Sequence, residues 1–465
     1  MFERRNAWRN ESRQPHRLLS VAVAALALVS GCAIVPTEKR HTPAEIAAYK
    51  ADDFVAPIAS TEGERIAREA SFKTIRDALA LPAGQDPDRI IPGALWNIGF
   101  LNVERESGIA LVRNALPGLA EQPPDYQRGI LSAAYTMYAA EVAPQVATLL
   151  SRIATPREFA IAAYTLLKSD GSAGQREFIR GTMKNVFPAW SAEPRLQRLE
   201  YVLTTDLQAE IRQRPALADL LAHPIRDGKP VIYSFQRQDR QRFGLAVVRG
   251  ANGQFVRNAD GSVFNVAHLA NAITNLPGTI TNGKTPQGLF TITGAGTATN
   301  KWIGPTPYLE SKIPVEATVA EFEHVEESQI ANSWNDAVYQ SFLPETWRQY
   351  VPFKEALLAG QAGRNEMLIH GTTINSNYYR GASFYPGTPS AGCMVAMETW
   401  RPEDGRQTTS DQLSLVKAFT RDGLDRGYLV VVELDDRLEP VALADVVSDI
   451  ETAEARVRSI RTAGR

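Results

Sequence analysis

Cysteine is scarce in this chain of 465 residues, which contains only Cys32 and Cys393. A scaffold of several disulfides is therefore excluded, as is a cysteine cluster with metal-ligand spacing. Histidine is also rare, with six residues and no ligand spacing among them. The sequence has no phosphate-binding glycine loop and no dinucleotide fingerprint. We therefore expect no cofactor and no metal.

An excess of charge of one sign is missing as well. The chain has 50 Lys and Arg against 52 Asp and Glu, for a net charge of −2. This balance gives no basic patch, so we expect no nucleic-acid partner. With 44% apolar and 22% charged residues, the composition is that of a globular protein long enough for two domains.

Long apolar runs are limited to one segment, Leu18–Ser30, which is too short to span a bilayer comfortably. Five arginines precede it, a pattern typical of an export signal. The run leads into Val29-Ser30-Gly31-Cys32, which resembles the bacterial lipobox. That resemblance implies that Cys32 is acylated and becomes the mature N-terminus.

We therefore expect residues 1–31 to be a lipoprotein signal peptide and residues 32–42 to be a lipidated tether. Loss of the signal removes five Arg and two Glu and leaves a net charge of about −5. Ala33 stands after the cysteine in place of Asp, which by resemblance to known sorting rules favours the outer membrane. The predicted location is the periplasm, with the protein anchored to the outer membrane through its lipid.

Helical periodicity dominates residues 43–222, which we predict to be an all-α domain. One apolar helical face contains Leu131, Ala134, Tyr135, Tyr138 and Val142. We predict that Pro144 interrupts this helix. Proline and glycine separate the helical segments, and no fixed repeat period is present.

The composition changes in residues 223–436, which are rich in β-branched and aromatic residues. The strand candidates are Pro230–Phe235, Phe243–Arg249, Gly288–Thr293, Glu366–His370 and Tyr428–Leu434. The first two predict a hairpin, and the whole segment predicts a mixed sheet or sandwich with inserted helices. Residues 437–465 predict a C-terminal helix. The expected fold class is multidomain α+β, an N-terminal all-α domain followed by a β-dominated catalytic domain.

Two short segments contain the residues suited to chemistry. A predicted strand ends in His370-Gly371, and a turn of small residues, Ser390-Ala391-Gly392, precedes Cys393. An imidazole can take the thiol proton, and the thiolate can attack a carbonyl carbon. Backbone N–H groups around Gly392 and Cys393 are the expected donors to the oxyanion. This thiol has no intramolecular partner in an oxidising compartment, so the alternatives are a buried inert residue and a reactive one.

These segments resemble the active-site signature of L,D-transpeptidases of the YkuD type. The resemblance rests on Ile369-His370-Gly371 and on Ser390-x-Gly392-Cys393 followed by an apolar residue. Upstream, Gly283–Phe290 is similar to the family's Thr-Pro-x-Gly-x-Phe segment. The resemblance covers roughly residues 228–435 and implies an L,D-transpeptidase-like catalytic domain.

The resemblance implies a role for each motif residue. Cys393 is the nucleophile, His370 the general base, the Gly371 carbonyl orients the imidazole, and Ser390 supports the turn that contains Gly392. The implied substrate is the peptidoglycan stem peptide, whose terminal D-alanine leaves as a thioester forms. An amine then resolves the thioester, either from a second diaminopimelate or from a lysine of a wall-linked lipoprotein.

The chain also departs from the family pattern. Many members have His at the position of Ala391, and Asn or Arg soon after the apolar residue, where this chain has Val395 and Ala396. Two alternatives therefore stay open. One is a hydrolase or amidase of the same fold that releases wall-bound lipoprotein, and the other is a non-catalytic wall-binding lipoprotein.

The loop between the two motifs is rich in aromatic residues. Tyr378, Tyr379, Arg380 and Tyr385 are predicted to form a substrate-binding lid, with Arg380 meeting a carboxylate. A surface loop packed on itself is an equal alternative. His268 and His324 are isolated, and structural hydrogen bonding is the expected role of each.

Overall fold

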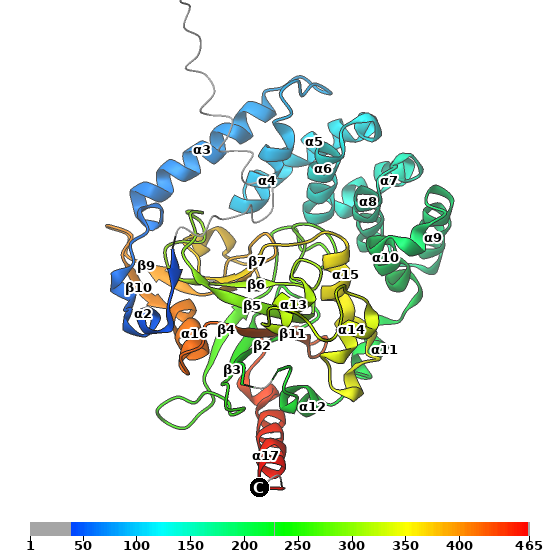
Figure 1. The fold of residues 1–465 in the computed structure, drawn as a ribbon. Helices are drawn as coiled ribbons and strands as arrows, with labels where there is room; N and C mark the ends of the chain where they lie inside the picture. Colours follow the sequence, from blue (N-terminus) through cyan, green and yellow to red (C-terminus); the bar gives the residue numbers. More distant parts are fainter. Residues whose placement is uncertain (1–38, 227, 464–465) are drawn as a thin grey trace, which may run out of the picture.

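A computed structural model describes residues 39–226 and 228–463 of the chain. It is a mixed α/β structure in which helices surround a closed β-sheet (Figure 1). The predicted signal peptide, Cys32 and most of the predicted tether lie outside the described residues.

The first half of the chain is helical, as predicted. Its α-helices are α2 (Pro43–Ala48), α3 (Thr61–Leu79), α4 (Ile91–Leu101), α5 (Arg105–Ala115), α6 (Pro124–Met137), α7 (Ala139–Leu149), α8 (Pro156–Ser169), α9 (Ala173–Val186), α10 (Pro194–Thr204), α11 (Leu207–Arg212) and α12 (Leu217–Ala222). Short 3-10 turns join them at Ala51–Asp53, Pro57–Ala59, Leu116–Glu121, Leu150–Arg152 and Trp190–Ala192. From α3 to α10 they form an arc along the top and right of the sheet in Figure 1.

Helix α8 lies at the centre of this arc, in contact with α6, α7, α9 and α10. Pro156 occupies its first turn, where a missing N–H leaves no intrahelical bond unmade. Its middle part, Phe159 to Leu166, is buried on every side, which is typical of a helix at the centre of a core.

The predicted helix break at Pro144 is wrong. Helix α6 ends at Met137 and α7 begins at Ala139. Tyr138 separates them with φ −134° and ψ 22°, and Pro144 lies inside α7. The Tyr138 side chain stays buried in the same core, so the apolar periodicity continues across the break and hides it.

In the described part of the chain, eight strands close into a barrel in the order β5, β11, β2, β3, β4, β8, β7, β6, after which β6 returns to β5. The strands are β1 (Arg40–His41), β2 (Val231–Gln236), β3 (Gly244–Arg249), β4 (Asn265–Leu269), β5 (Gly288–Gly296), β6 (Tyr308–Lys312), β7 (Met367–His370), β8 (Met394–Ala396), β9 (Glu398–Trp400), β10 (Gln407–Ser410) and β11 (Gly427–Glu433). Strand β1 joins the far end of β5, and β9 with β10 forms a separate ribbon.

Five strands were predicted from the sequence and are confirmed: β2, β3, β5, β7 and β11. The hairpin of β2 and β3 is confirmed as well. The sheet is mixed, because β11 pairs with β2 in parallel and β7 pairs with β8 in parallel. The predicted alternative of a sandwich is wrong, since β5 pairs with both β11 and β6 and closes the sheet.

Both faces of the sheet are covered by side chains. On β2, Tyr233 and Phe235 join a core that includes α12 and the C-terminal helix, while Ile232 joins a second core. Neighbouring residues point to opposite faces of a strand, so a strand that is buried throughout reads as a continuous apolar run. This is why β2 and β11 could be predicted from the sequence.

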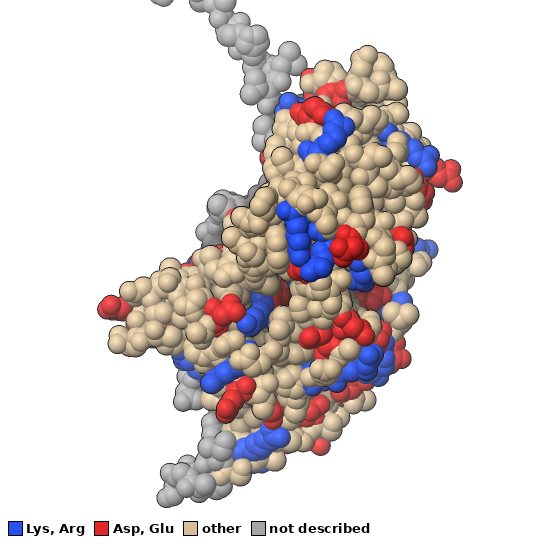
Figure 2. All heavy atoms as spheres, turned by 90° about the vertical axis from the view of Figure 1, so that its right-hand side faces the viewer, with Lys and Arg blue, Asp and Glu red and all other residues tan. Residues whose placement is uncertain are grey.

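Further helices lie within and after the sheet. They are α13 (Val319–Glu323), α14 (Asp336–Ser341), α15 (Glu355–Gln361), α16 (Asp411–Thr420) and α17 (Val447–Ala463), with 3-10 turns at Glu345–Trp347, Val351–Lys354, Ser376–Tyr379 and Leu443–Asp445. Helix α17 is the predicted C-terminal helix and packs on α12. On the face in Figure 2, cationic and anionic side chains are intermixed.

The predicted division at residues 222/223 is not confirmed. Leu276 and Ile280 from the β-rich half belong to the core of the helical arc. Helix α2 packs on α16, and α12 packs on α17, so both ends of the predicted helical domain lie against the barrel. The end of the predicted tether also differs from expectation, because Arg40 and His41 form β1 and Thr42 caps α2.

Candidate active site

The turn before β8 brings Ser390, Gly392 and Cys393 into one hydrogen-bonded unit. Ser390 Oγ accepts a bond from the Gly392 N–H at 2.9 Å and donates one to the Cys393 carbonyl at 2.8 Å. Gly392 has φ +125°, a conformation that favours glycine. A Cβ at this position would lie 2.3 Å from Arg364 Nη2. The turn therefore requires glycine for two independent reasons.

The upstream motif lies directly beneath this turn. Thr285 Oγ1 donates to the Gly392 carbonyl at 2.9 Å, across 107 residues of sequence. The buried Arg364 donates to the carbonyl oxygens of Gly283 at 3.0 Å and Lys284 at 2.8 Å. The two sequence motifs thus form a single structural unit.

His370 ends β7, and its backbone lies opposite Val395 of β8 in the parallel pair. Its Nδ1 lies 2.5 Å from the Gly371 carbonyl oxygen, which can only accept a hydrogen bond. Nδ1 therefore holds the proton, and Nε2 is left as an acceptor. Burial lowers the pKa of His370 to about 4, against the opposing effect of the bond to Gly371, so the ring is neutral at pH 7.

Cys393 is in no disulfide, is fully buried and is located immediately before β8. Its Sγ receives the N–H of Leu368 at 3.4 Å and lies 3.7 Å from the Glu366 carbonyl oxygen. The thiol packs in a small apolar cluster with Leu368, Ile303 and Tyr308. Leu368 and His370 share a face of β7, so the thiol and the imidazole lie on the same face of two neighbouring strands.

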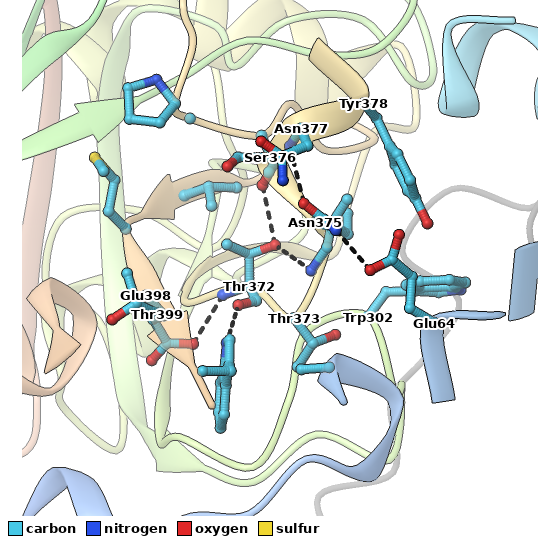
Figure 3. Close-up of a pocket in the computed structure, with 18 of the residues that line it drawn as sticks. Glu64, Trp302, Thr372, Thr373, Asn375, Ser376, Asn377, Tyr378, Glu398 and Thr399 are labelled. Atoms are coloured by element: carbon cyan, nitrogen blue, oxygen red, sulfur yellow. Dashed lines mark hydrogen bonds between the residues drawn. The ribbon is translucent and has the colours of Figure 1, made fainter. Parts of the chain in front are cut away.

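A cavity of about 320 Å³ begins where both motifs end (Figure 3). Thr372 follows His370-Gly371 and lines it, as does Val395 from β8. The helical half contributes Glu64 from α3, which points toward Tyr378. Neither Cys393 nor His370 is among the residues that line this cavity.

Glu398, from β9, is a cavity residue that the sequence analysis missed. Its carboxylate accepts bonds from the Thr372 N–H at 2.9 Å, Gln407 Nε2 at 2.9 Å and Ser410 Oγ at 2.7 Å. Burial raises its pKa to about 7, and these hydrogen bonds oppose that shift. A Cβ at Gly371 would lie 2.1 Å from this carboxylate, so glycine after the histidine leaves room for it. No motif in the sequence signals this contact.

The structure places the four predicted lid residues differently from one another. Tyr378 lines the cavity, whereas Tyr379 is buried and its hydroxyl donates to the Phe100 carbonyl at 2.9 Å. Arg380 is exposed, and its Nε donates to Asn377 at 2.9 Å. Tyr385 is exposed and does not line the cavity.

This loop packs on the helical half of the chain. Tyr378 contacts the Phe100 ring edge to face, and its carbonyl accepts a bond from Asn102 at 3.3 Å. Asn375 Nδ2 donates to Glu64 at 2.5 Å (Figure 3). Helix α3 therefore lines the cavity, and contacts from α3 and from the end of α4 hold the loop.

The two histidines for which the sequence predicts structural hydrogen bonding, His268 and His324, have such partners. His268 Nδ1 lies 2.9 Å from Ser234 Oγ, and His324 Nε2 lies 3.0 Å from the Gly427 carbonyl. Burial lowers the pKa of His268 to about 3 and that of His324 to about 4, so both rings are neutral at pH 7.

Within residues 39–226 and 228–463, no group of three or more His, Cys, Asp or Glu is arranged to hold a metal ion. The same residues include no helix with the length and apolar character needed to cross a membrane. No protein-family model matches the chain, and neither a curated protein nor a solved structure matches it. The geometry of the site therefore carries the proposed function.

Proposed function

We propose that this chain is a thiol-dependent acyltransferase of the L,D-transpeptidase type that acts on peptidoglycan stem peptides. The observation that carries the proposal is the shared face of β7 and β8, to which two sequence motifs contribute a neutral imidazole and a buried thiol. The fixed tautomer of His370 leaves Nε2 able to accept a proton.

The reaction follows from these two groups. His370 Nε2 takes the thiol proton, and the Cys393 sulfur forms a bond to the stem-peptide carbonyl carbon. When the tetrahedral intermediate collapses, the C–N bond breaks, and the leaving D-alanine takes the proton from the imidazolium. A thioester remains. The neutral form of an acceptor amine then attacks it with its nitrogen, loses a proton to His370, and breaks the C–S bond, and His370 returns that proton to the departing sulfur.

One expected oxyanion donor needs revision. The Gly392 N–H already donates to Ser390 Oγ, so it is not available to an oxyanion in this conformation. The remaining candidate from the turn is the N–H of Cys393. Full burial of the sulfur also means that a substrate carbonyl reaches it only after side chains over it, Ile303 and Tyr308 among them, have moved.

The cavity supports an amine as the acceptor in preference to water. Its acidic side chains are Glu64 and Glu398, and no Lys or Arg is among the described residues that line it. Trp400 adds an aromatic ring, which also attracts cations, whereas Tyr378 and Trp302 already lie beneath Arg68 and Lys301. A diaminopimelate or lysine amine is cationic before it attacks, and this lining concentrates it near the thioester.

The direct test is acylation of the purified protein by a carbapenem, read by intact-protein mass spectrometry. We expect one adduct on the wild type, none on Cys393→Ala, and much slower labelling of His370→Gln. Equal labelling of wild type and Cys393→Ala would overturn the proposal. Digestion of treated sacculi then separates a transferase, which raises the amount of 3→3 dimers, from a hydrolase or amidase, which does not.

The full burial of Cys393 favours a second candidate, a non-catalytic wall-binding protein in which the thiol is structural. In that case Cys393→Ala leaves both sacculus binding and wall composition unchanged. The transferase proposal instead expects binding to persist and the wall composition to change.

We further propose that the protein is exported and held at the outer membrane by a lipid on Cys32. Metabolic labelling with a radioactive fatty acid tests this proposal. Label is expected on the wild type and absent from Cys32→Ala, which should be recovered in the soluble fraction. Label on both proteins, or on neither, contradicts the lipid anchor.

A further inference from the structure

A second cavity, of about 240 Å³, lies between the helical arc and the end of the barrel. Tyr164 of α8 and Arg198 of α10 line it from the helical side. Lys284, Glu355 and Glu433 line it from the β-rich half. Its volume is roughly eight times the ~30 Å³ that one water molecule takes in the liquid. It is therefore large enough for a small organic molecule.

Part of the charge in this cavity is already paired. Arg240 Nη2 lies 2.9 Å from Glu433 Oε1, and Lys284 Nζ lies 3.3 Å from the same oxygen. Arg240 and Glu433 are buried, so their interaction is strong in the low dielectric of this region. These three residues form a fixed wall with a net charge of +1, in which both cations share the Glu433 carboxylate.

Three polar atoms beside that wall have no hydrogen-bond partner among the described residues. They are the Tyr164 hydroxyl, Arg198 Nε and Glu355 Oε1. Tyr164 is 5% exposed and Glu355 is 1% exposed, so bulk water does not satisfy them. The nearest approach of Arg198 to Glu355 is 3.8 Å, which makes them an ion pair but is too long for a hydrogen bond. Buried polar atoms without partners are rare in folded proteins.

The chemistry of these atoms defines what complements them. Arg198 donates and has a positive charge, Glu355 accepts and has a negative charge, and the Tyr164 hydroxyl does either. A ligand with an anionic acceptor and a cationic donor a few ångströms apart satisfies both charges at once. A purely anionic or purely cationic ligand would bond to one of these atoms and leave the other without a hydrogen bond in a buried place, at a cost in free energy.

We infer that this cavity is a binding site for a small zwitterion, an amino acid or dipeptide, whose carboxylate meets Arg198 and whose ammonium meets Glu355. The site is separate from the cavity beside Thr372 and Glu398, because the two share no lining residue. Binding does not depend on the thiol, so the inference stands or falls independently of the acyltransferase proposal.

The test is isothermal titration of the purified protein with alanine and with alanyl-alanine, up to about 10 mM, a range that reaches dissociation constants near 1 mM. These two probes distinguish a free amino acid from a peptide. Saturable binding of at least one of them is expected. Three analogues serve as controls. N-acetylalanine lacks the ammonium, alanine methyl ester lacks the carboxylate, and N-acetylalanine methylamide lacks both charges. Each is expected to bind at least about tenfold more weakly, since each leaves a charged group of the cavity without its hydrogen bond.

A matched pair of variants locates the site. Tyr164→Phe removes a hydroxyl that has no partner in the free protein, so folding is retained while affinity falls by about fivefold. Tyr428→Phe removes another buried, unpartnered hydroxyl that lies outside the cavity, and affinity is expected to stay within about twofold. Cys393→Ala is expected to bind as the wild type does.

The inference is overturned by any of three results. One is the lack of saturable binding of either zwitterion. The second is equal binding of N-acetylalanine methylamide, which would mean that charge is irrelevant. The third is an unchanged affinity in Tyr164→Phe, which would place the ligand elsewhere.

Discussion

Thr285 donates a hydrogen bond from its Oγ1 to the carbonyl oxygen of Gly392 at 2.9 Å, and this bond joins the two motifs that the sequence keeps 107 residues apart. Thr285 is fully buried, so no water replaces the bond if it is lost. The turn that precedes the thiol is therefore held from below by the segment that begins β5.

We expect Thr285→Val to lower the free energy of unfolding by about 1–3 kcal/mol, because it removes a buried donor and keeps the shape of the side chain. Urea titration measures the change. Thr279→Val is the matched control, since Thr279 is equally buried and its hydroxyl has no partner among the described residues. Similar losses in the two variants would show that the bond to Gly392 contributes nothing specific.

Gly392→Ala should be severely destabilising, by roughly 2–4 kcal/mol, because φ is +125° and the new Cβ would lie 2.7 Å from the Gly283 carbonyl oxygen. Gly381 provides the comparison, with φ +89° and open space around the Cβ position. Gly381→Ala should lower the free energy of unfolding by about 1 kcal/mol, because alanine disfavours a positive φ and meets no steric clash there. Thermal unfolding of both variants measures the difference, and equal losses would refute the steric argument.

Much of this turn was predictable from the sequence, because its residue types are constrained locally. Gly392 and Ser390 follow from turn chemistry, and His370 follows from a strand that ends in His-Gly. Glu398 was not predictable, because it reaches Gly371 only through the ribbon of β9 and β10. Its importance comes from a contact in space that has no pattern in the sequence.

The same contrast holds for the sheet. Strands β2 and β11 are buried throughout and read as apolar runs, whereas β8 has three residues and β6 reads Tyr-Leu-Glu-Ser-Lys. Barrel closure depends on the pairing of β5 with β6, which includes a register shift between Ile292 and Gly294. Register between distant strands is set by packing, so periodicity alone does not predict closure.

Glu398 should make stability depend on pH near neutrality. Its folded pKa of about 7 is raised above the model-compound value of 4.5, so its contribution is fully present below pH 4.5 and is lost as pH rises through 7. We expect the free energy of unfolding of the wild type, relative to Glu398→Gln, to fall by on the order of 2 kcal/mol between pH 5 and pH 8. Urea titrations of both proteins across this range measure it.

The comparison between the two proteins is essential, because Glu316 also has a pKa raised to about 7 by burial and shifts the pH profile of the wild type in the same direction. Glu316 is present in both proteins, so its effect cancels in the difference. If the free energies of unfolding of wild type and Glu398→Gln changed with pH in parallel, the pKa of Glu398 would be the same in the folded and unfolded states, and the prediction would be wrong.

Glu64 tests whether the cavity beside Thr372 selects an amine. In the proposed reaction, Glu64→Gln removes a negative charge from the acceptor side and leaves the thiol and the imidazole untouched. We expect the ratio of aminolysis to hydrolysis of the thioester to fall by about fivefold, which corresponds to roughly 1 kcal/mol of lost attraction. Mass spectrometry of the products from a stem tetrapeptide with a soluble amine acceptor measures this ratio.

The rate of thioester formation should stay unchanged in the same variant, because it precedes acceptor binding. Glu62→Gln is the control, since Glu62 also lies on α3 but is exposed, pairs with Arg65 and does not line the cavity. If Glu64→Gln instead slowed acylation, its bond to Asn375 would be the relevant contact. Helix α3 would then act by holding the loop in place, and the acidic lining would have no part in acceptor choice.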